Sequence, residues 1–503
     1  MHKKVLVLGT NDYTTDDATT QLAIAQGSSN HGIVLDPDFA PVENGFYHTT
    51  ILDLNSGQIL ELAQRFDFVI MLDQPQSAWS HWKPLLSTYK IMCEIESKGI
   101  ITQFKQNKNV QGFIEFSELV KTNKSFCIYP WIEIHDRQGC ASLCIRSTAY
   151  PVKQTKNITD WKNDPEFSVI RQKMLAGERL PNCHVCYDYE DKGIESYRQF
   201  ETKDWISKLG IHSVQQLHNL DKPYFYELEL NNICNVMCRS CEPRFSHLIA
   251  KEAVENNIIA SSSPVKRYYS NIDVVNIDKL CSKSRVYMQG GEPTIMPEVL
   301  EFLNRCIAQG KTDTDISMCT NGQHLSTKFL DAVNQFSNVN FSFSIDGYKH
   351  VNDYWRHGTE WDKIIRNAKL LQSYGHNISI NTVPGIYNVT NLHLLFEFLE
   401  DEFPHSGIYL QINKKPQQSA YNFPIPDLVV ESMEKCKQTS VYYADGKSNK
   451  TCIDSLYDYY NKGPKCNLDD LRDFFTENDR LDKIRDMCLR DYIPELEQCR
   501  ALL

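Results

Sequence analysis

The sequence predicts an α/β protein built around a parallel sheet. From Tyr224 onward, six short runs rich in β-branched and aromatic residues alternate with helix-like stretches. The runs are YFYELEL, SRVYMQGG, DISMCTNG, VNFSFSID, NISINTVP and GIYLQIN. Six strand-then-helix units in a row favour parallel pairing, and an open, partial (β/α)6 barrel is the simplest closure. The chemistry of such barrels lies at the carboxyl ends of the strands.

Helical periodicity supports the alternation. Apolar residues recur at helical spacing between the strand-like runs, in residues 297–308, 327–336, 360–374 and 391–402. We therefore assign residues 222–425 to one core of β/α units. The pattern from about residue 427 is mostly helical, and we expect a C-terminal helical region at 426–503.

The chain of 503 residues is too long for one ordinary hydrophobic core. Strand-like runs at 4–10 and 66–72, the second preceded by a helix-like stretch at 58–65, predict an N-terminal α/β domain over 1–118. The single glycine after VLVL does not make a dinucleotide-binding fingerprint. Residues 119–205 differ in composition, with cysteines, tryptophans and turn residues among short runs. They predict a small Cys-rich module with a helix at 161–177.

The net charge of -11 disfavours nucleic acid and anionic membranes as partners. The apolar run after MHKK is shorter than the roughly 7–15 residues of a secretory signal core. No apolar stretch approaches the roughly 18 residues that cross a bilayer. We expect a cytoplasmic protein without membrane spans.

Cysteine is the unusual component of the composition. Seventeen cysteines, an odd number scattered along a chain without a signal peptide, do not resemble a secreted disulfide framework. Metal ligands and free thiols fit this usage better. Isolated cysteines such as Cys93, Cys281 and Cys306 are expected to be small buried hydrophobes.

Three cysteines stand close together directly after the first strand of the core. Cys234, Cys238 and Cys241 form a CxxxCxxC loop. Three thiolates this close can hold one iron–sulfur cluster, and the missing fourth ligand leaves one iron open to a substrate. A zinc site with a remote fourth ligand is the alternative.

This loop resembles the signature of the radical S-adenosylmethionine (SAM) superfamily. The second strand ends in a GGEP sequence that resembles the family segment contacting the SAM amino group, and Glu292 would accept from that ammonium. The third and fourth strands end in TNG and SIDG, and a family-like segment follows with Arg356. The resemblance implies SAM contacts by Gly290, Gly291, Glu292, Pro293, Asn321, Ser344, Asp346 and Arg356. It places Ser344 and Asp346 near the ribose or carboxylate, and Arg356 against the carboxylate. TNG and SIDG are also ordinary turn sequences.

The Cys-rich module resembles the auxiliary-cluster modules called SPASM or twitch domains. FCIYPW precedes a GxxxxC arrangement that starts at Gly139, and a later CHVC is followed by Glu190, Ser196 and Arg198. The resemblance implies a second [4Fe-4S] cluster on Cys127, Cys144, Cys183 and Cys186, with Cys140 as a substitute for Cys144. A structural zinc on four cysteines is the alternative. Such modules usually follow the radical SAM core, whereas this one precedes it.

The resemblance implies an oxygen-sensitive enzyme that cleaves SAM reductively at a [4Fe-4S] cluster. The resulting 5′-deoxyadenosyl radical would abstract hydrogen from a substrate. By analogy with SPASM-bearing enzymes, the substrate class is a peptide or protein side chain. A small metabolite, such as a sugar or nucleotide derivative, is the alternative, and a non-catalytic zinc- or cluster-bearing binding protein is a third hypothesis. A flavodoxin or ferredoxin is the expected electron donor.

Overall fold

The protein forms two compact units in the computed structural model. The first comprises residues 1–131 and 168–221, and the second comprises 132–167 and 222–503. The predicted Cys-rich segment 119–205 contributes to both units. The structure describes residues 5–8, 32–35, 68–72, 92–96, 100–101, 116, 119–137, 139–147, 153–154, 162–191, 195–269, 272–337, 339–404, 406–413, 415–443, 448–462 and 466–503.

The first unit contains a mostly parallel sheet with the strand order β2-β1-β3-β4-β5. Among the strands described in this sheet, only β5 runs antiparallel to its neighbour. The predicted strands at 4–10 and 66–72 are confirmed as β1 and β3, whereas the predicted helix at 58–65 lies outside the described residues. The strands are β1 (Val5–Leu8), β2 (Gly32–Leu35), β3 (Phe68–Leu72), β4 (Met92–Glu96) and β5 (Ile100–Ile101).

Most helices of the first unit lie within the predicted Cys-rich segment 119–205. The predicted helix at 161–177 is confirmed as α6 (Pro165–Leu175), whose first turn belongs to the second unit. Helix α8 begins with a capping box, in which the Ser196 side chain accepts from the Gln199 N–H, and it ends at Gly210 in the left-handed conformation. The other helices here are α7 (His184–Glu190), α8 (Tyr197–Leu209) and α9 (Val214–His218).

The second unit is built on an open sheet in which the six predicted core strands are confirmed. The strand order is β16-β15-β13-β12-β11-β9-β6-β7-β8, and the two edge strands do not pair with each other among the described residues. The predicted partial barrel is therefore confirmed. The six strands, all parallel, are β9 (Phe225–Glu229), β11 (Arg285–Gln289), β12 (Asp315–Thr320), β13 (Val339–Ser344), β15 (Asn377–Thr382) and β16 (Gly407–Leu410).

A seventh parallel strand, β6 (Glu133–Arg137), extends this sheet and was not expected from the sequence. It pairs with β9 in parallel and is followed by the antiparallel strands β7 (Cys140–Ser142) and β8 (Lys153–Gln154). Apolar Ile132 and Ile134 alternate with polar Glu133 and His135, which suits a strand with one apolar face. The first part of the Cys-rich segment is thus continuous with the core sheet.

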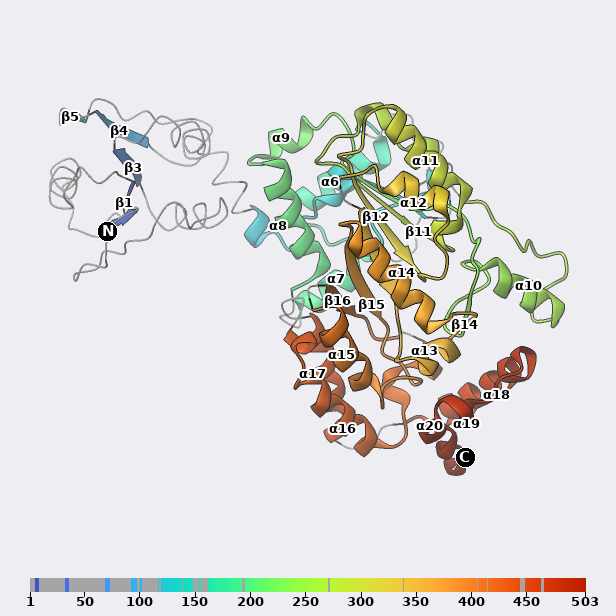
Figure 1. Cartoon of the computed structure of the whole chain (residues 1–503). Coiled ribbons are helices and arrows are strands. Elements are labelled where there is room, and N and C mark those ends of the chain that lie inside the picture. Colours follow the sequence, from blue (N-terminus) through green and yellow to red (C-terminus); the bar gives the residue numbers. More distant parts are fainter. Residues whose placement is uncertain are drawn as a thin grey trace. The chain divides into compact units, whose positions relative to one another are not determined.

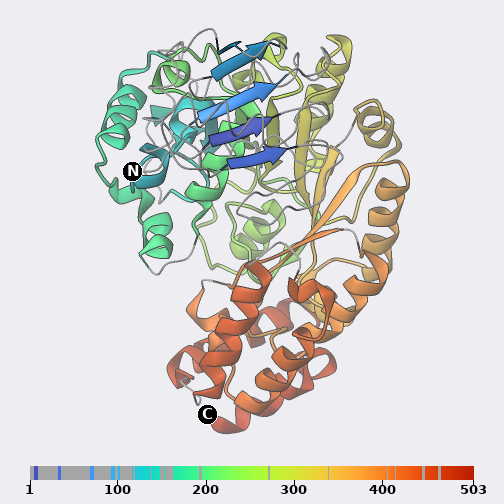
Figure 2. The same cartoon turned by 90° about the vertical axis from the view of Figure 1, so that its left-hand side faces the viewer.

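The predicted helices of the core are confirmed and cover one side of the strands (Figures 1 and 2). Helix α11 begins with Pro297 at its first position, where a missing N–H costs nothing. The helices are α10 (His247–Glu255), α11 (Pro297–Ala308), α12 (Thr327–Val333), α13 (His350–Trp355), α14 (Trp361–Ser373) and α15 (Leu392–Glu402).

The two faces of the core sheet differ in chemistry because side chains alternate along each strand. Apolar residues such as Ile316, Met318, Phe341 and Phe343 are fully buried in the hydrophobic core. The residues between them form a second, polar face that includes Tyr287, Gln289, Ser317, Cys319, Ser342 and Ser344. This polar inner face leads to the carboxyl ends of the strands.

The predicted C-terminal helical region is confirmed, and its helices gather at one end of the β/α array (Figures 1 and 2). Asn467 caps the longest of them, α18, by accepting from the N–H groups of Asp469 and Asp470. The helices are α16 (Pro426–Cys436), α17 (Ser448–Asn461), α18 (Leu468–Arg485), α19 (Leu489–Tyr492) and α20 (Pro494–Gln498).

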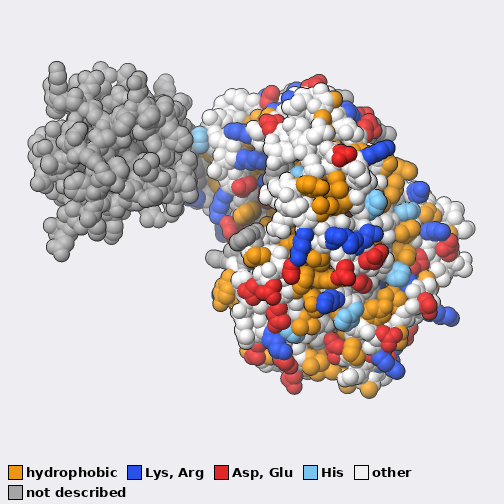
Figure 3. Space-filling view, in the orientation of Figure 1, with side chains coloured by type: hydrophobic (Ala, Val, Ile, Leu, Met, Phe, Trp, Pro, Cys, Tyr) orange, Lys and Arg blue, Asp and Glu red, His pale blue; other side chains and the backbone are white. Residues whose placement is uncertain are grey.

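Charges of both signs are interspersed over the face of the second unit in Figure 3. Basic side chains do not form a broad area of one sign on this face. Within the described ranges, each helix is too short or too polar to cross a bilayer.

Candidate functional site

Three cysteines gather in the loop that follows β9. Burial raises the pKa of the Cys234 thiol, and the neighbouring Cys238 thiol raises it further. Burial likewise raises the pKa of Cys241 to about 12, with Cys238 again adding to the shift. Each thiol therefore interacts electrostatically with the others. The structure brings the predicted ligand set together.

The surroundings of these sulfur atoms fit an iron–sulfur cluster. The Arg356 Nη1 atom donates to Cys238 Sγ at 3.6 Å, and the Asn321 Nδ2 atom donates to Cys234 Sγ at 3.9 Å. Hydrogen bonds to cysteine sulfur and nearby charge tune such clusters. A bound cation would also stabilise the thiolates that burial disfavours.

A short antiparallel ladder holds the cysteine loop in place. Strand β10 (Met237–Cys238) pairs with β14 (Arg356–His357), which lies directly after α13. The Arg239 N–H donates to the Trp355 carbonyl at 2.8 Å, and the Trp355 indole donates to Ser240 Oγ at 3.1 Å. The segment after the fourth core strand therefore fixes the loop.

The two glycines of GGEP pack the end of β11 against the cysteine loop. The Gly291 N–H donates to the Asn231 carbonyl at 3.0 Å, and the Glu292 N–H donates to the Ile233 carbonyl at 2.7 Å. A Cβ atom on Gly291 would lie 2.1 Å from the Ile233 carbonyl oxygen, so only glycine fits. The glycines thus allow close approach to protein backbone, whereas close approach to the ligand was expected. The SAM contacts of Gly290, Gly291 and Pro293 stay predictions.

Glu292 is fully buried and joins the ends of two strands. Its Oε1 atom accepts from the Thr294 N–H, the Thr294 hydroxyl and the Thr320 hydroxyl, at 2.7 to 3.1 Å. Its Oε2 atom accepts from the Asn321 N–H at 2.7 Å. Burial raises the pKa of this carboxyl, and the four hydrogen bonds act against the shift. Oε2 keeps capacity for a further donor.

Asn321 links the end of β12 to the cysteine loop. Its side chain donates to Asn235 Oδ1 at 2.8 Å as well as approaching the Cys234 sulfur. Its own N–H is the donor to Glu292. The predicted site residues at the ends of β11 and β12 are therefore neighbours of each other and of the loop.

Asp346 and Arg356 form a buried ion pair, with 2.7 Å between Oδ2 and Nη2. Burial lowers the pKa of Arg356, but Asp346 and the nearby thiols raise it more, so that Arg356 stays charged. Both residues were expected to contact SAM. The structure pairs them with each other, and Asp346 Oδ1 also accepts from the Val383 N–H at 2.8 Å. Ser344 Oγ contacts Cys319 Sγ at 3.4 Å on the inner face.

Arg239 is a buried residue of the cysteine loop that sequence reasoning missed. Its guanidinium pairs with Asp482 of α18 and also donates to Asn478 Oδ1 at 3.1 Å. It lies over the Tyr354 ring, 3.8 Å from the ring centre, and donates from Nε to the Tyr354 carbonyl at 2.9 Å. Its position between two predicted cluster ligands in the sequence was the signal that could have identified it.

A second arginine ties α18 to the same loop. Arg485 forms a buried pair with Glu252 of α10, with 2.9 Å between Nε and Oε2. Its Nη1 atom donates to the Met237 carbonyl at 2.9 Å. The C-terminal helix therefore supports the cysteine loop from outside the predicted core.

Three cysteines of the predicted auxiliary set lie close together in the first unit. Burial raises the pKa of Cys127, and the Cys183 and Cys186 thiols raise it further. Burial raises the pKa of Cys183 to about 11, with Cys186 adding to the shift. These interactions are consistent with three ligands of one metal site.

Residues of the E-x5-S-x-R pattern hold this cysteine site together. The Arg198 guanidinium forms a buried pair with Glu190, with 2.6 Å between Nη2 and Oε2. It also donates to the Phe126 carbonyl, directly before Cys127. The Ser196 hydroxyl donates to Glu190 at 2.5 Å. The predicted residues Glu190, Ser196 and Arg198 thus join the helix that carries Cys186 to the chain at Cys127.

Cys140 and Cys144 belong to the second unit. Cys140 begins β7, and buried Cys144 follows it, with its carbonyl accepting from the N–H and hydroxyl of Ser147. Cys140 therefore lies in the β6–β7 hairpin that extends the core sheet, and Cys144 lies after it.

Residues 228–398 match the family model described as "Radical SAM superfamily". This part of the chain is a radical SAM domain. The match lies within the predicted core 222–425, and it confirms the predicted superfamily and its enzyme class at the level of this domain. It does not cover the auxiliary module, which stays a prediction.

Several solved structures share features with the chain at low identity. Native anSMEcpe with bound AdoMet is 17% identical, covers 42% of this chain and 57% of that chain, and gives a TM-score of 0.31. SuiB from Streptococcus suis bound to S-adenosylmethionine is 16% identical, with 50% and 53% covered and a TM-score of 0.27. SuiB bound to the precursor peptide SuiA is 12% identical, with 54% and 61% covered and a TM-score of 0.30. The match thus spans little more than half the length of these proteins, and no curated protein matches the sequence.

Proposed function

We propose that this protein is a radical SAM enzyme that cleaves SAM at a [4Fe-4S] cluster held by Cys234, Cys238 and Cys241. The supporting observation is that three thiols, one buried and two partly buried, meet at the carboxyl end of the core sheet. Two of them receive hydrogen bonds, from Arg356 and Asn321. When bound, the cluster would supply the electron that splits SAM into methionine and a radical that removes hydrogen from a substrate.

The chain's own residues would bind and orient SAM beside the loop. Glu292 Oε2 has capacity left for the ammonium group, because among the described residues it accepts a hydrogen bond from Asn321 alone. Arg356 keeps its Nε–H for the SAM carboxylate, since that atom is buried without a partner among the described residues. Ser344 and Asp346 stand at the end of the neighbouring strand, where the ribose or carboxylate is expected. The polar inner face would take the substrate.

Anaerobic incubation with SAM and dithionite tests this function. The reconstituted protein should form 5′-deoxyadenosine, and the variant with Cys234, Cys238 and Cys241 all changed to Ala should form none. A matched variant, Cys281→Ala with Cys488→Ala, removes two thiols outside both predicted sites and should keep the activity. Absence of 5′-deoxyadenosine from the wild type would favour the non-catalytic binding protein.

We also propose an auxiliary [4Fe-4S] cluster, with Cys127, Cys183 and Cys186 as ligands and Cys144 or Cys140 as the fourth. The mutual electrostatic interaction of the first three thiols supports it. Reconstituted protein should then hold about eight irons, and the triple variant of the core cysteines about four. Zinc in place of the second set of irons would overturn the proposal.

The proposed substrate is a peptide or protein side chain, by analogy with enzymes that carry SPASM-like modules. A small metabolite is the alternative. The product of a small reading frame beside the gene, incubated with enzyme, SAM and reductant, should change in mass if the peptide hypothesis holds. A flavodoxin or ferredoxin from the same cell should replace dithionite as the donor.

A further inference from the structure

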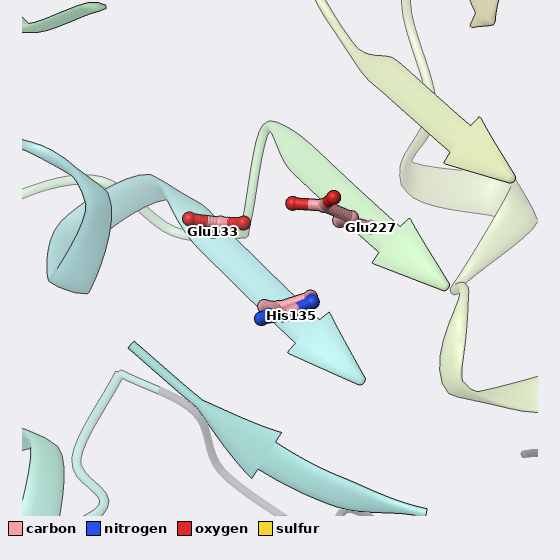
Figure 4. A group of neighbouring side chains, drawn as sticks. All are labelled: Glu133, His135 and Glu227. Carbon is pink, nitrogen blue, oxygen red and sulfur yellow. The ribbon is translucent and has the colours of Figure 1, made fainter. Parts of the chain in front are cut away.

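A further set of potential metal ligands, which contains no cysteine, lies in the core sheet. Glu133 and His135 lie on β6, and Glu227 lies on the adjacent strand β9. One ligand atom from each of the three residues lies within 4.8 Å of the other two. Figure 4 shows the three side chains gathered beside the two neighbouring strands.

The strand register places these side chains on the inner face. His135 stands directly opposite Glu227 in the parallel pairing, and Glu133 lies two residues before His135, on the same side of β6. Glu227 in turn stands opposite Tyr287 of β11, which belongs to the polar face. All three residues are at most 2% exposed. Two carboxylates and an imidazole thus share a buried region.

His135 has one ring nitrogen in contact with a hydroxyl group and the other without a partner among the described residues. Its Nδ1 atom contacts Ser142 Oγ at 2.5 Å, while its Nε2 atom is buried without a hydrogen-bond partner among the described residues. A neutral imidazole with one nitrogen hydrogen-bonded and the other available is the usual form of a metal-binding histidine.

Glu227 is held in orientation by a neighbouring strand. Gln289 Nε2 donates to Glu227 Oε1 at 2.8 Å. Metal-binding carboxylates commonly receive such a hydrogen bond from an outer residue. Gln289 is the last residue of β11 and directly precedes Gly290 of GGEP, so this contact connects the acidic group to the candidate SAM site.

We propose that Glu133, His135 and Glu227 bind a divalent transition-metal ion in the interior of the partial barrel. Nitrogen and oxygen donors suit zinc, manganese or iron(II) as single ions, whereas the cysteine sites suit clusters. A divalent cation would be attracted by the two carboxylates, and carboxylate oxygen is a ligand that such ions accept. Three protein ligands leave coordination positions for water or a substrate oxygen. The inference goes beyond the proposed function and does not depend on SAM cleavage.

Manganese(II) is a suitable probe because it favours carboxylate and imidazole ligands over thiolates. The anaerobic holoprotein is titrated with Mn²⁺, and the bound ion is measured by loss of the free-ion EPR signal. We expect about one bound ion per chain, because the described residues contain one such ligand group. Glu227→Gln should weaken binding roughly tenfold or more, and Glu133→Gln should act in the same way.

Glu229→Gln is the matched control. Glu229 lies on β9, two residues after Glu227 and similarly buried, but it is outside the ligand group. This variant should bind Mn²⁺ as the wild type does, and Mn²⁺ should raise the melting temperature of both but not that of Glu227→Gln. The proposal is wrong if the Glu227 and Glu229 variants bind Mn²⁺ equally well. It is also wrong if the wild type binds no Mn²⁺ at a free concentration of about 1 mM, at which even a weak site would be occupied.

Discussion

Arg239, which lies between Cys238 and Cys241, forms a buried ion pair with Asp482 of helix α18, with 2.5 Å between Nη2 and Oδ1. Tyr354 also donates its hydroxyl proton to Asp482 at 2.8 Å. The C-terminal helix therefore completes the support of the cysteine loop. Helix α18 therefore does more than pack against the core, because it pairs with a charged residue of the cysteine loop.

Asp482→Ala should destabilise the protein and the cysteine loop together. The change leaves the Arg239 charge buried and unpaired, which costs about 3–5 kcal/mol in comparable cases. Chemical denaturation measures the loss of stability, and iron analysis after reconstitution measures the loss of cluster binding. Asp479→Ala is the control, because Asp479 lies on the same helix in an exposed pair with Arg500. That variant should change the stability by about 1 kcal/mol or less. Equal effects of the two changes would contradict the role of α18.

Gly291→Ala should displace the cysteine loop. Its added Cβ would lie 2.1 Å from the Ile233 carbonyl oxygen, so backbone must move, at a cost of about 1–3 kcal/mol. We expect a lower iron content and little 5′-deoxyadenosine. Gly310→Ala is a suitable comparison, because a Cβ there meets nothing within 4 Å and only the left-handed backbone is penalised, by about 1–2 kcal/mol. Normal iron content in the Gly291 variant would contradict the packing argument.

Glu292→Ala should weaken SAM binding while both clusters remain. Losing a charge-assisted contact costs about 1.5–3 kcal/mol, which corresponds to roughly tenfold to hundredfold in affinity. The structure adds a second effect, because the donors on Thr294, Thr320 and Asn321 lose their common acceptor. Stability should therefore fall by a further few kcal/mol, about 1–3 for each buried donor left unpaired.

Equilibrium binding of SAM and thermal unfolding measure the two effects of Glu292→Ala separately. Glu301→Ala, on the exposed side of α11, is the control and should change neither. An unchanged dissociation constant for SAM together with lower stability would make Glu292 a structural residue only.

Arg356→Gln should lower the reduction potential of the core cluster. Arg356 donates to Cys238 Sγ, and its positive charge favours the reduced, more negative state of the cluster. If the contact is worth about 1.5 kcal/mol more in the reduced state, the shift is about 60 mV. EPR-monitored redox titration measures it. Arg305→Gln, in an exposed pair with Asp273, should leave the potential unchanged. The same potential in the Arg356 variant would place its charge outside the reach of the cluster.

Much of the core could be predicted from the sequence because its signals are local. The six strands carry two-residue alternation, the helices carry helical periodicity, and Cys234, Cys238 and Cys241 are close in sequence as well as in space. The predicted neighbours Glu292 and Asn321 also follow from this pattern, since each lies at the carboxyl end of an adjacent parallel strand.

Contacts between distant segments could not be predicted in this way. The pairing of β6 with β9 joins residues about ninety positions apart, and only the alternation in WIEIH hinted at a strand. The pair of Arg239 with Asp482 spans 243 positions and has no periodic signal. Residues expected to bind a ligand were also found to bind each other, as Asp346 and Arg356 do.

The role of the auxiliary cysteines can be tested by changing Cys183 and Cys186 to Ala together. A cluster with four cysteine ligands has no free position for a substrate, so electron transfer or structural support is its favoured role. We expect that the variant loses about half of its iron and its substrate turnover, yet keeps some uncoupled formation of 5′-deoxyadenosine.

A purely structural role predicts a different outcome for the same variant. The Cys127 segment is also held by Arg198, which pairs with Glu190 and donates to the Phe126 carbonyl, and these contacts do not involve the two cysteines. The fold around the site should therefore survive the double change, and circular dichroism should confirm it.

Arg198→Ala, by contrast, leaves Glu190 buried and unpaired and should lower the free energy of unfolding by about 3–5 kcal/mol. If the double cysteine variant is folded and still forms product at the normal rate, the auxiliary site has no part in catalysis. If it unfolds while Arg198→Ala does not, the cysteine site itself holds the segment together.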